Sequence, residues 1–160
     1  MDPLDHYEME HTKSCFDVIK KHDVMLSYPY QSYRYIIDLL REAAIDPKVI
    51  SIKITVYRLV SKNSKIIHTL INAARNGKSV TVVVELKARF DEESNMNYAN
   101  ILQEEGVRVI FGAPGLKVHT KLFVIKRKEE KGSVRYAHIG TGNFHEGTAN
   151  LYCDHSLLTA

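Results

Sequence analysis

Cysteine is scarce in this sequence, with two residues among 160. Cys15 and Cys153 lie far apart and form no Cys-x-x-Cys pair. This scarcity excludes the disulfide-stapled class of small secreted domains. We expect two free thiols in a reducing compartment, and therefore a cytoplasmic protein that can also associate peripherally with a membrane.

Long hydrophobic runs, an N-terminal signal peptide, internal repeats and low-complexity linkers are also lacking. Their absence excludes a transmembrane segment and a secretory precursor among these residues. The net charge is only +3. So small an excess suits an anionic substrate without requiring nucleic acid, and we expect no nucleic-acid partner.

The length and the 44% hydrophobic content suit one domain with a real core. Residues 1–22 begin with a polar, aperiodic stretch, and we interpret them as a lead-in segment. Residues 23–160 are then the domain itself. The chain stops at Ala160 without a polar tail, which suggests a domain of a longer protein.

Strand and helix patterns alternate along residues 23–160. Runs of β-branched and apolar residues predict strands over 23–30, 49–57, 79–86, 107–111, 116–125, 134–139 and 151–158. Apolar residues at helical spacing predict three helices, which begin at Ser32, Ser64 and Asp91. The alternation favours an α/β fold with a largely parallel mixed sheet flanked by helices and a closing antiparallel hairpin.

Residues 116–125 combine an apolar strand pattern with His119 and Lys121. Residues i and i+2 of a strand project from the same face, so these two side chains should lie side by side. One interpretation is a polar edge strand with two solvated side chains. The other is a nucleophile beside an anion-binding ammonium group.

Basic residues follow two of the predicted strands at their carboxyl ends. Arg58 follows residues 49–57, and Lys87 and Arg89 follow residues 79–86. In open α/β sheets the ligand crevice lies beyond these ends. Guanidinium groups bind phosphate oxygens bidentately, so we favour a phosphate cradle over arginines that are merely solvated or paired with nearby acids.

A small-residue loop, Gly140-Thr141-Gly142-Asn143, follows the predicted return strand of the hairpin. Glycines let backbone N–H groups approach an anion, and Asn143 would add an amide donor. The order His-x-Lys, hairpin, glycine loop and Asn resembles the phospholipase D superfamily, in which the histidine attacks phosphorus. That superfamily's usual Asp, five residues after the lysine, is Lys126 here.

Three longer blocks resemble the bacterial polyphosphate kinase family. They comprise residues 82–93, 113–121 and 136–144, and residues 156–160 and 23–30 add to the likeness. That family transfers the terminal phosphate of ATP to polyphosphate. Its large enzyme carries two phospholipase D-like catalytic domains, of which this chain matches the first.

The resemblance implies a role for each site residue. His119 matches the autophosphorylated histidine, with Lys121 and Asn143 beside it. Arg58 and Arg89 match the magnesium and phosphate site, where we expect them to hold phosphate oxygens because arginine cannot ligate a metal. Tyr152 matches an ATP-binding residue. The implied partners are ATP and ADP with Mg²⁺, inorganic polyphosphate, the other domains of the same polypeptide and, at full length, further copies in a homo-oligomer.

The implied reaction is in-line attack of a neutral His119 nitrogen on the γ-phosphorus of ATP. Either Glu146 or Asp154 could accept a hydrogen bond from the other ring nitrogen and fix the tautomer. Two other functions fit the same residues. A phospholipase D-type phosphodiesterase or nuclease half-site would also use His119, whereas a non-catalytic polyanion-binding module would not need it.

Overall fold

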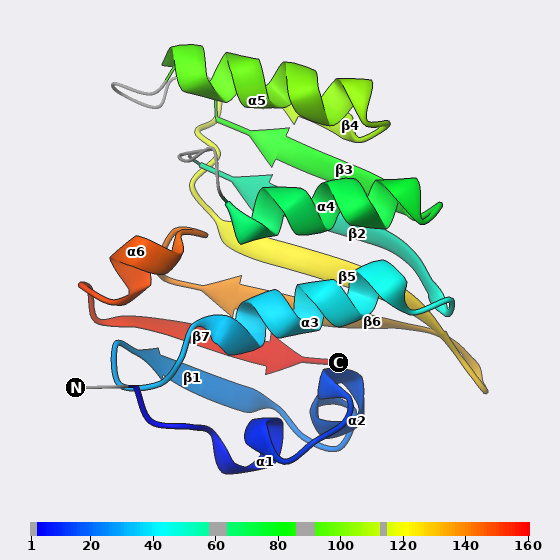
Figure 1. The fold of residues 1–160 in the computed structure, drawn as a ribbon, viewed down its shortest axis with the longest axis vertical. Coiled ribbons are helices and arrows are strands. Elements are labelled where there is room, and N and C mark those ends of the chain that lie inside the picture. Colours follow the sequence, from blue (N-terminus) through cyan, green and yellow to red (C-terminus); the bar gives the residue numbers. More distant parts are fainter. Residues whose placement is uncertain (1–2, 58–63, 86–91, 113–114) are drawn as a thin grey trace.

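The computed structural model describes residues 3–57, 64–85, 92–112 and 115–160, without the side chains of residues 92–95. Arg58, Lys87, Arg89 and the expected helix start Asp91 lie outside the described residues. The described strands form one seven-stranded sheet in the order β1-β7-β6-β5-β2-β3-β4 (Figure 1). The α/β class expected from the sequence is therefore confirmed.

The strands agree with the expected segments to within a few residues, apart from β5. They are β1 (Val24–Tyr28), β2 (Val49–Val56), β3 (Ser79–Val84), β4 (Arg108–Phe111), β5 (Lys121–Glu129), β6 (Gly132–Gly140) and β7 (Asp154–Thr159). The helices are α1 (Tyr7–Glu10), α2 (Cys15–Ile19), α3 (Arg34–Ile45), α4 (Lys65–Arg75), α5 (Glu92–Glu104) and α6 (Glu146–Ala149).

Helix α4 begins and ends beside residues whose chemistry favours helix ends. The Ser64 hydroxyl accepts the Ile67 N–H, and Gly77 has the positive φ of 78° that follows many helix ends. Ser32 is the expected N-cap of helix α3, but the helix begins at Arg34 and its N-cap is Tyr33, one residue later. The Arg34 N–H donates to the Ser32 hydroxyl at 3.3 Å.

The expectation of a largely parallel sheet is wrong. Among the described strands, only β2–β3 and β3–β4 pair in parallel, whereas β2–β5, β5–β6, β6–β7 and β1–β7 are antiparallel. The hairpin does not close the sheet at an edge. Strand β5 enters beside β2, so the parallel βαβ units occupy one half and the antiparallel strands the other.

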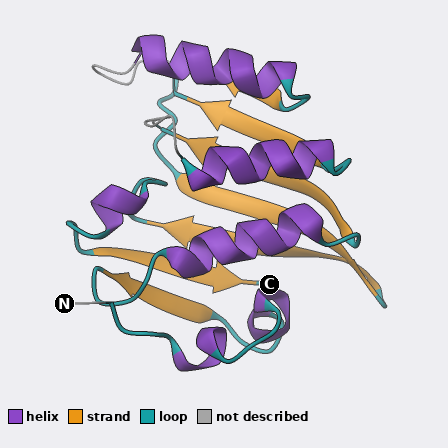
Figure 2. Ribbon diagram, in the orientation of Figure 1, coloured by secondary structure: helices purple, strands orange, loops and turns teal. Residues whose placement is uncertain are grey.

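Helices α3, α4 and α5 lie across the same face of the sheet (Figure 2). In β3, Val80, Val82 and Val84 are buried on this face, whereas Thr81 and Val83 on the other are only half-buried. The continuous apolar run 79–84 therefore reflects one fully covered face and not burial on both.

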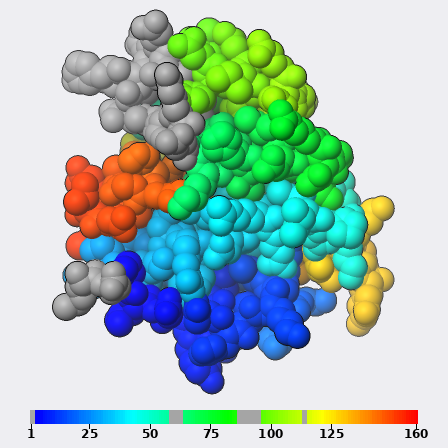
Figure 3. Space-filling view, viewed as in Figure 1, coloured from blue at the N-terminus to red at the C-terminus, as the bar shows by residue number. Residues whose placement is uncertain are grey.

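The N-terminal segment packs against the rest of the chain instead of extending from it. Phe16 on α2 is fully buried and makes an edge contact with the Tyr136 ring at 4.7 Å between centroids. The Ser14 hydroxyl and the Cys15 N–H both donate to the carboxylate of Glu42 on α3. The space-filling view shows this segment in dark blue beside α3 (Figure 3). A domain boundary at residue 22 stays a prediction.

Strand β5 differs from the expected segment at both ends. It begins at Lys121, so residues 117–120 are irregular and the expected strand over 116–125 is wrong in its first half. It continues to Glu129, so the charged stretch 126–129 is strand, and only residues 130–131 form the turn before β6.

Within the described ranges, no helix is long and apolar enough to cross a membrane. Cys15 is buried and Cys153 is exposed, and both thiols are free, as expected from their separation in the sequence.

Candidate phosphate-binding active site

His119 lies in the irregular stretch just before β5, and Lys121 is the first residue of that strand. The Lys121 ammonium lies 3.1 Å from Nδ1 of His119 and also donates to the backbone carbonyl of His119. The two side chains meet as the His-x-Lys spacing predicted. Lys121 is buried while the imidazole is exposed, so the ring can be reached from solvent.

Tyr57, which follows β2, forms one wall of the site. Its ring meets the His119 ring edge-on, with 5.1 Å between centroids and an interplanar angle of 75°. The ammonium groups of Lys117 and Lys121 lie 5.4 and 5.7 Å from the Tyr57 centroid. These are cation–π distances, so one aromatic ring holds the imidazole and two cations together.

The surroundings lower the pKa of both basic groups of the His-x-Lys pair. The charge of Lys121 lowers the pKa of His119 most, and burial and Lys117 add to the effect. Burial lowers the pKa of Lys121, with a further contribution from Lys117, while Asp154 acts in the opposite direction. The lowered pKa of His119 favours the neutral ring, the state in which a ring nitrogen can attack.

The glycines of the 140–143 loop make room for neighbouring side chains. A Cβ at Gly140 would lie 2.7 Å from the His138 ring, and one at Gly142 would lie 2.5 Å from the Asp154 carboxylate. The Asp154 carboxylate also accepts the Thr141 hydroxyl at 2.7 Å. Because β5 pairs Lys121 with Gly140, this loop starts beside the site.

His138 and Asn143 bring polar atoms into the interior next to this loop. His138 Nε2 lies 2.8 Å from the Ser156 hydroxyl, and its ring stacks on Phe123 with 4.9 Å between centroids. Burial lowers the pKa of His138 to about 4. The Nδ1 atom of His138 and the Oδ1 atom of Asn143 are buried without a hydrogen-bond partner in the described structure.

The two candidates for orienting His119 have other partners. Glu146 lies 2.8 Å from the Lys65 ammonium, and Asp154 holds Thr141. Tyr152 is 62% exposed in the turn after α6, and no described contact joins it to His119 or Lys121. Of the predicted site residues, the described structure brings only His119 and Lys121 into direct contact; Arg58 and Arg89 lie outside it.

Sequence reasoning missed three residues that touch the His119 segment. They are Tyr57, Thr55 on β2, and Glu85 after β3. Glu85 is only 5% exposed, and its carboxylate accepts the Val118 N–H at 2.7 Å. An acid at the end of the apolar run 79–84 was the available signal, because a buried carboxylate needs donors.

The described residues do not provide a ligand set for a resident metal ion. They contain no group of three His, Cys, Asp or Glu side chains that could hold one. Two expected metal residues are arginines, which cannot ligate an ion.

Comparison with known proteins identifies the family of this chain. Residues 14–160 match the family described as polyphosphate kinase C-terminal domain 1. The chain belongs to this polyphosphate kinase family. A polyphosphate kinase of Vibrio vulnificus is 57% identical over the whole chain, and one of Escherichia coli K12 is 61% identical over 91% of it. The chain spans only 23% and 21% of these relatives.

Solved structures extend the likeness to the fold. Polyphosphate kinase from Porphyromonas gingivalis superposes with a TM-score of 0.88 at 42% identity, covering all of this chain and 27% of that one. Nuc, a phospholipase D family member from Salmonella typhimurium, superposes with a TM-score of 0.59 at 18% identity, covering 86% of this chain and 82% of its own. The fold is therefore phospholipase D-like, as the His-x-Lys and glycine-loop order implied.

Proposed function

We propose that this chain is a catalytic domain of a polyphosphate kinase, which transfers the γ-phosphate of ATP reversibly to polyphosphate through a phosphohistidine on His119. The observation that carries the proposal is the exposed His119 ring held between Tyr57 and Lys121. Lys117 and Lys121 supply positive charge where a phosphate would bind, and the family match supports ATP and polyphosphate as substrates.

In the first step a His119 ring nitrogen attacks the γ-phosphorus. The N–P bond forms as the bond to the bridging oxygen breaks, and ADP leaves with the electron pair. Lys121 lies against Nδ1 before the reaction. We propose that the phosphate draws this ammonium away, which frees the ring lone pair and places the charge on the equatorial oxygens.

In the second step a terminal oxygen of polyphosphate attacks the same phosphorus, and the N–P bond breaks. Asn143 Nδ2, Arg58 and Arg89 are proposed to bind phosphate oxygens, and Tyr152 to bind the nucleotide. Mg²⁺ enters as the Mg²⁺–ATP substrate. We further propose that the other domains of the polypeptide complete the site, so the 160-residue chain alone should turn over poorly.

The test is single-turnover labelling of the full-length protein with ATP radiolabelled at the γ-phosphate. The expected product is an acid-labile, alkali-stable protein label that His119→Ala abolishes and that added polyphosphate removes. His68→Ala, which changes an exposed histidine on α4, is the matched control and should label like the wild type. Label that persists in His119→Ala would refute His119 as the nucleophile.

The same experiment separates the other functions. A phospholipase D-type hydrolase would cleave phosphodiesters without ATP and without a label that polyphosphate can remove. A polyanion-binding module would bind polyphosphate equally well after His119→Ala and would never become labelled. Either result would replace the kinase proposal.

A further inference from the structure

The position of His119 is not set by sheet hydrogen bonding. The β2–β5 register ends at the pair Ile54–Phe123, and residues 117–120 belong to no strand. An irregular segment is positioned by the partners that its backbone groups and side chains find. Besides the Tyr57 ring and the Lys121 ammonium described above, two side chains bind its backbone groups: Glu85, which follows β3, and Thr55 on β2.

Glu85 holds the segment before His119. Its carboxylate accepts the Val118 N–H at 2.7 Å, and its own N–H donates to the Val56 carbonyl at 3.2 Å. Glu85 is therefore fixed to the end of β2 through its backbone while its buried side chain reaches the His119 segment. A charge-assisted bond in a buried place is among the stronger single contacts a side chain can supply.

Thr55 holds the segment after His119. Its hydroxyl donates to the Thr120 carbonyl and accepts the Leu122 N–H at 3.1 Å. The hydroxyl thus replaces the backbone ladder at the point where β5 begins. Together with Glu85, it fixes backbone groups one residue before and one residue after His119.

We propose that Glu85 and Thr55 are positioning residues, which clamp the backbone on both sides of His119 so that its ring meets the phosphorus in line. This inference rests on the proposed function. A nucleophile displaced by about 1 Å can react roughly 100-fold more slowly, although the substrate still binds. The clamp therefore acts on the rate of phosphohistidine formation and not on the affinity for ATP.

The test compares Glu85→Gln, Thr55→Val and Thr55→Ser in the full-length protein. We expect the first two to slow phosphohistidine formation by about 10- to 100-fold, with half-saturating ATP within about two-fold of wild type. Thr55→Ser keeps the hydroxyl and should restore most of the rate. Thr69→Val removes a buried α4 hydroxyl that donates to the Lys65 carbonyl, and it should match the wild type.

A second measurement does not depend on kinase activity. Hydrogen exchange without ATP should be faster over residues 117–122 in Glu85→Gln and Thr55→Val, and unchanged there in Thr69→Val. Wild-type protein that forms no phosphohistidine would overturn the proposed function. The hydrogen-exchange result alone would then decide whether Glu85 and Thr55 clamp the backbone. Wild-type exchange over 117–122 in both variants, or a rise in half-saturating ATP that accounts for the lost rate, would overturn the clamp. If Glu85→Gln fails to fold, Thr55→Val decides between these outcomes.

Discussion

The two ends of strand β5 carry charged side chains in opposite surroundings. At the start, Lys121 lies beside His119 and near Lys117, and the pKa values of His119 and Lys121 are lowered. At the end, Arg127 lies between Asp46 and Glu129. Burial acts against its charge, but hydrogen bonds to these two carboxylates and their opposite charges prevail and raise the pKa of Arg127.

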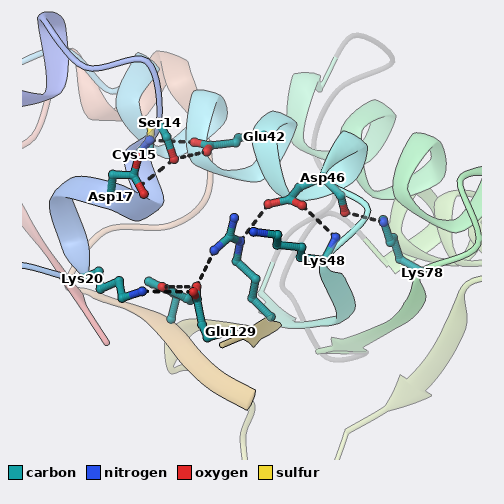
Figure 4. Close-up of polar contacts among 11 residues, drawn as sticks. Ser14, Cys15, Asp17, Lys20, Glu42, Asp46, Lys48, Lys78 and Glu129 are labelled. Atoms are coloured by element: carbon teal, nitrogen blue, oxygen red, sulfur yellow. Dashed lines mark hydrogen bonds and ion pairs between the residues drawn. The ribbon is translucent and has the colours of Figure 1, made fainter. Parts of the chain in front are cut away.

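At the end of β5 around Arg127, called the far end below, the charged groups form a closed network of ion pairs and hydrogen bonds. Glu129 also binds the Tyr136 hydroxyl at 2.8 Å and Lys20 at 3.1 Å, and Asp46 accepts the Lys48 N–H and, through its carbonyl, Lys78 (Figure 4). The surroundings favour the charged forms of Asp46, Arg127 and Glu129, since the pKa values of the two carboxyl groups are lowered and that of the guanidinium is raised. At the start of β5 around Lys121, called the near end below, neighbouring cations raise the free energy of each positive charge. A bound phosphate would lower that free energy. One end is a balanced set of opposite charges, and the other is a group of neighbouring cations, which supports the proposed phosphate site.

The largest expected effect comes from removing the Lys121 cation at the near end. Lys121→Met should slow phosphohistidine formation by about 100- to 1000-fold, since one preorganised electrostatic donor is lost. It should also raise the pKa of His119 toward its ordinary value, because Lys121 is the main cause of the lowering. Single-turnover labelling and a histidine NMR titration check the two effects. An unchanged His119 pKa would contradict this account of the near end.

At the far end, the matching change is Arg127→Met. It leaves two mostly buried carboxylates without their shared partner, so the free energy of unfolding should fall by about 3 kcal/mol. Urea unfolding measures this loss. Lys126→Met, one residue away on the less buried face, is the control and should change stability by less than about 0.5 kcal/mol. Equal losses in the two variants would show that the network contributes little.

Acid should weaken the far end in a defined pH window. Burial opposes ionisation of Glu129, but hydrogen bonds from Tyr136, Arg127 and Lys20 prevail and lower its pKa to about 2. A lowered carboxyl pKa gives stability that is complete above the unfolded value of 4.5 and is lost as the pH falls toward 2. The loss should reach about 3 kcal/mol in urea unfolding, and Glu129→Gln should remove this dependence. A wild-type stability that stays flat over this window would contradict the network.

The smallest expected effect comes from removing the Lys117 cation at the near end. Lys117→Gln removes the outer, exposed cation beside Tyr57. Because water screens an exposed charge, the labelling rate should fall only about three-fold, the equivalent of less than 1 kcal/mol. The His119 pKa should rise less than in Lys121→Met. A larger effect than that of Lys121→Met would reverse the order of the two lysines.

Local chemistry made much of the fold predictable. β-Branched runs marked β2 and β3, and Ser64 marked the start of α4, because these signals act within a few residues. The start of β5 was not predictable in this way. Residues 117–120 have a strand pattern, but the side chains of Glu85 and Thr55 take the backbone groups that a strand would have paired.

The sequence predicted the His119–Lys121 pair of the candidate site but not the residues that hold it. The contact between His119 and Lys121 was predicted, but from a strand geometry that His119 does not have. Tyr57 looks like the end of an ordinary strand, and the acid at position 85 indicates a buried carboxylate without indicating which N–H it binds. The glycines were assigned to anion binding, whereas Gly140 and Gly142 leave room for the side chains of His138 and Asp154.

The sequence by itself determined the α/β elements, the His-x-Lys pair and the family. These depend on residue types and on spacings of a few residues, which can be read directly from the sequence. Tertiary structure alone decided the mixed sheet, the opposite charge environments at the two ends of β5, and the contacts of Glu85 and Thr55 on either side of His119. The contacts of Glu85 with Val118 and of Thr55 with Thr120 join residues 33 and 65 positions apart, and only the folded chain brings such residues within hydrogen-bonding distance.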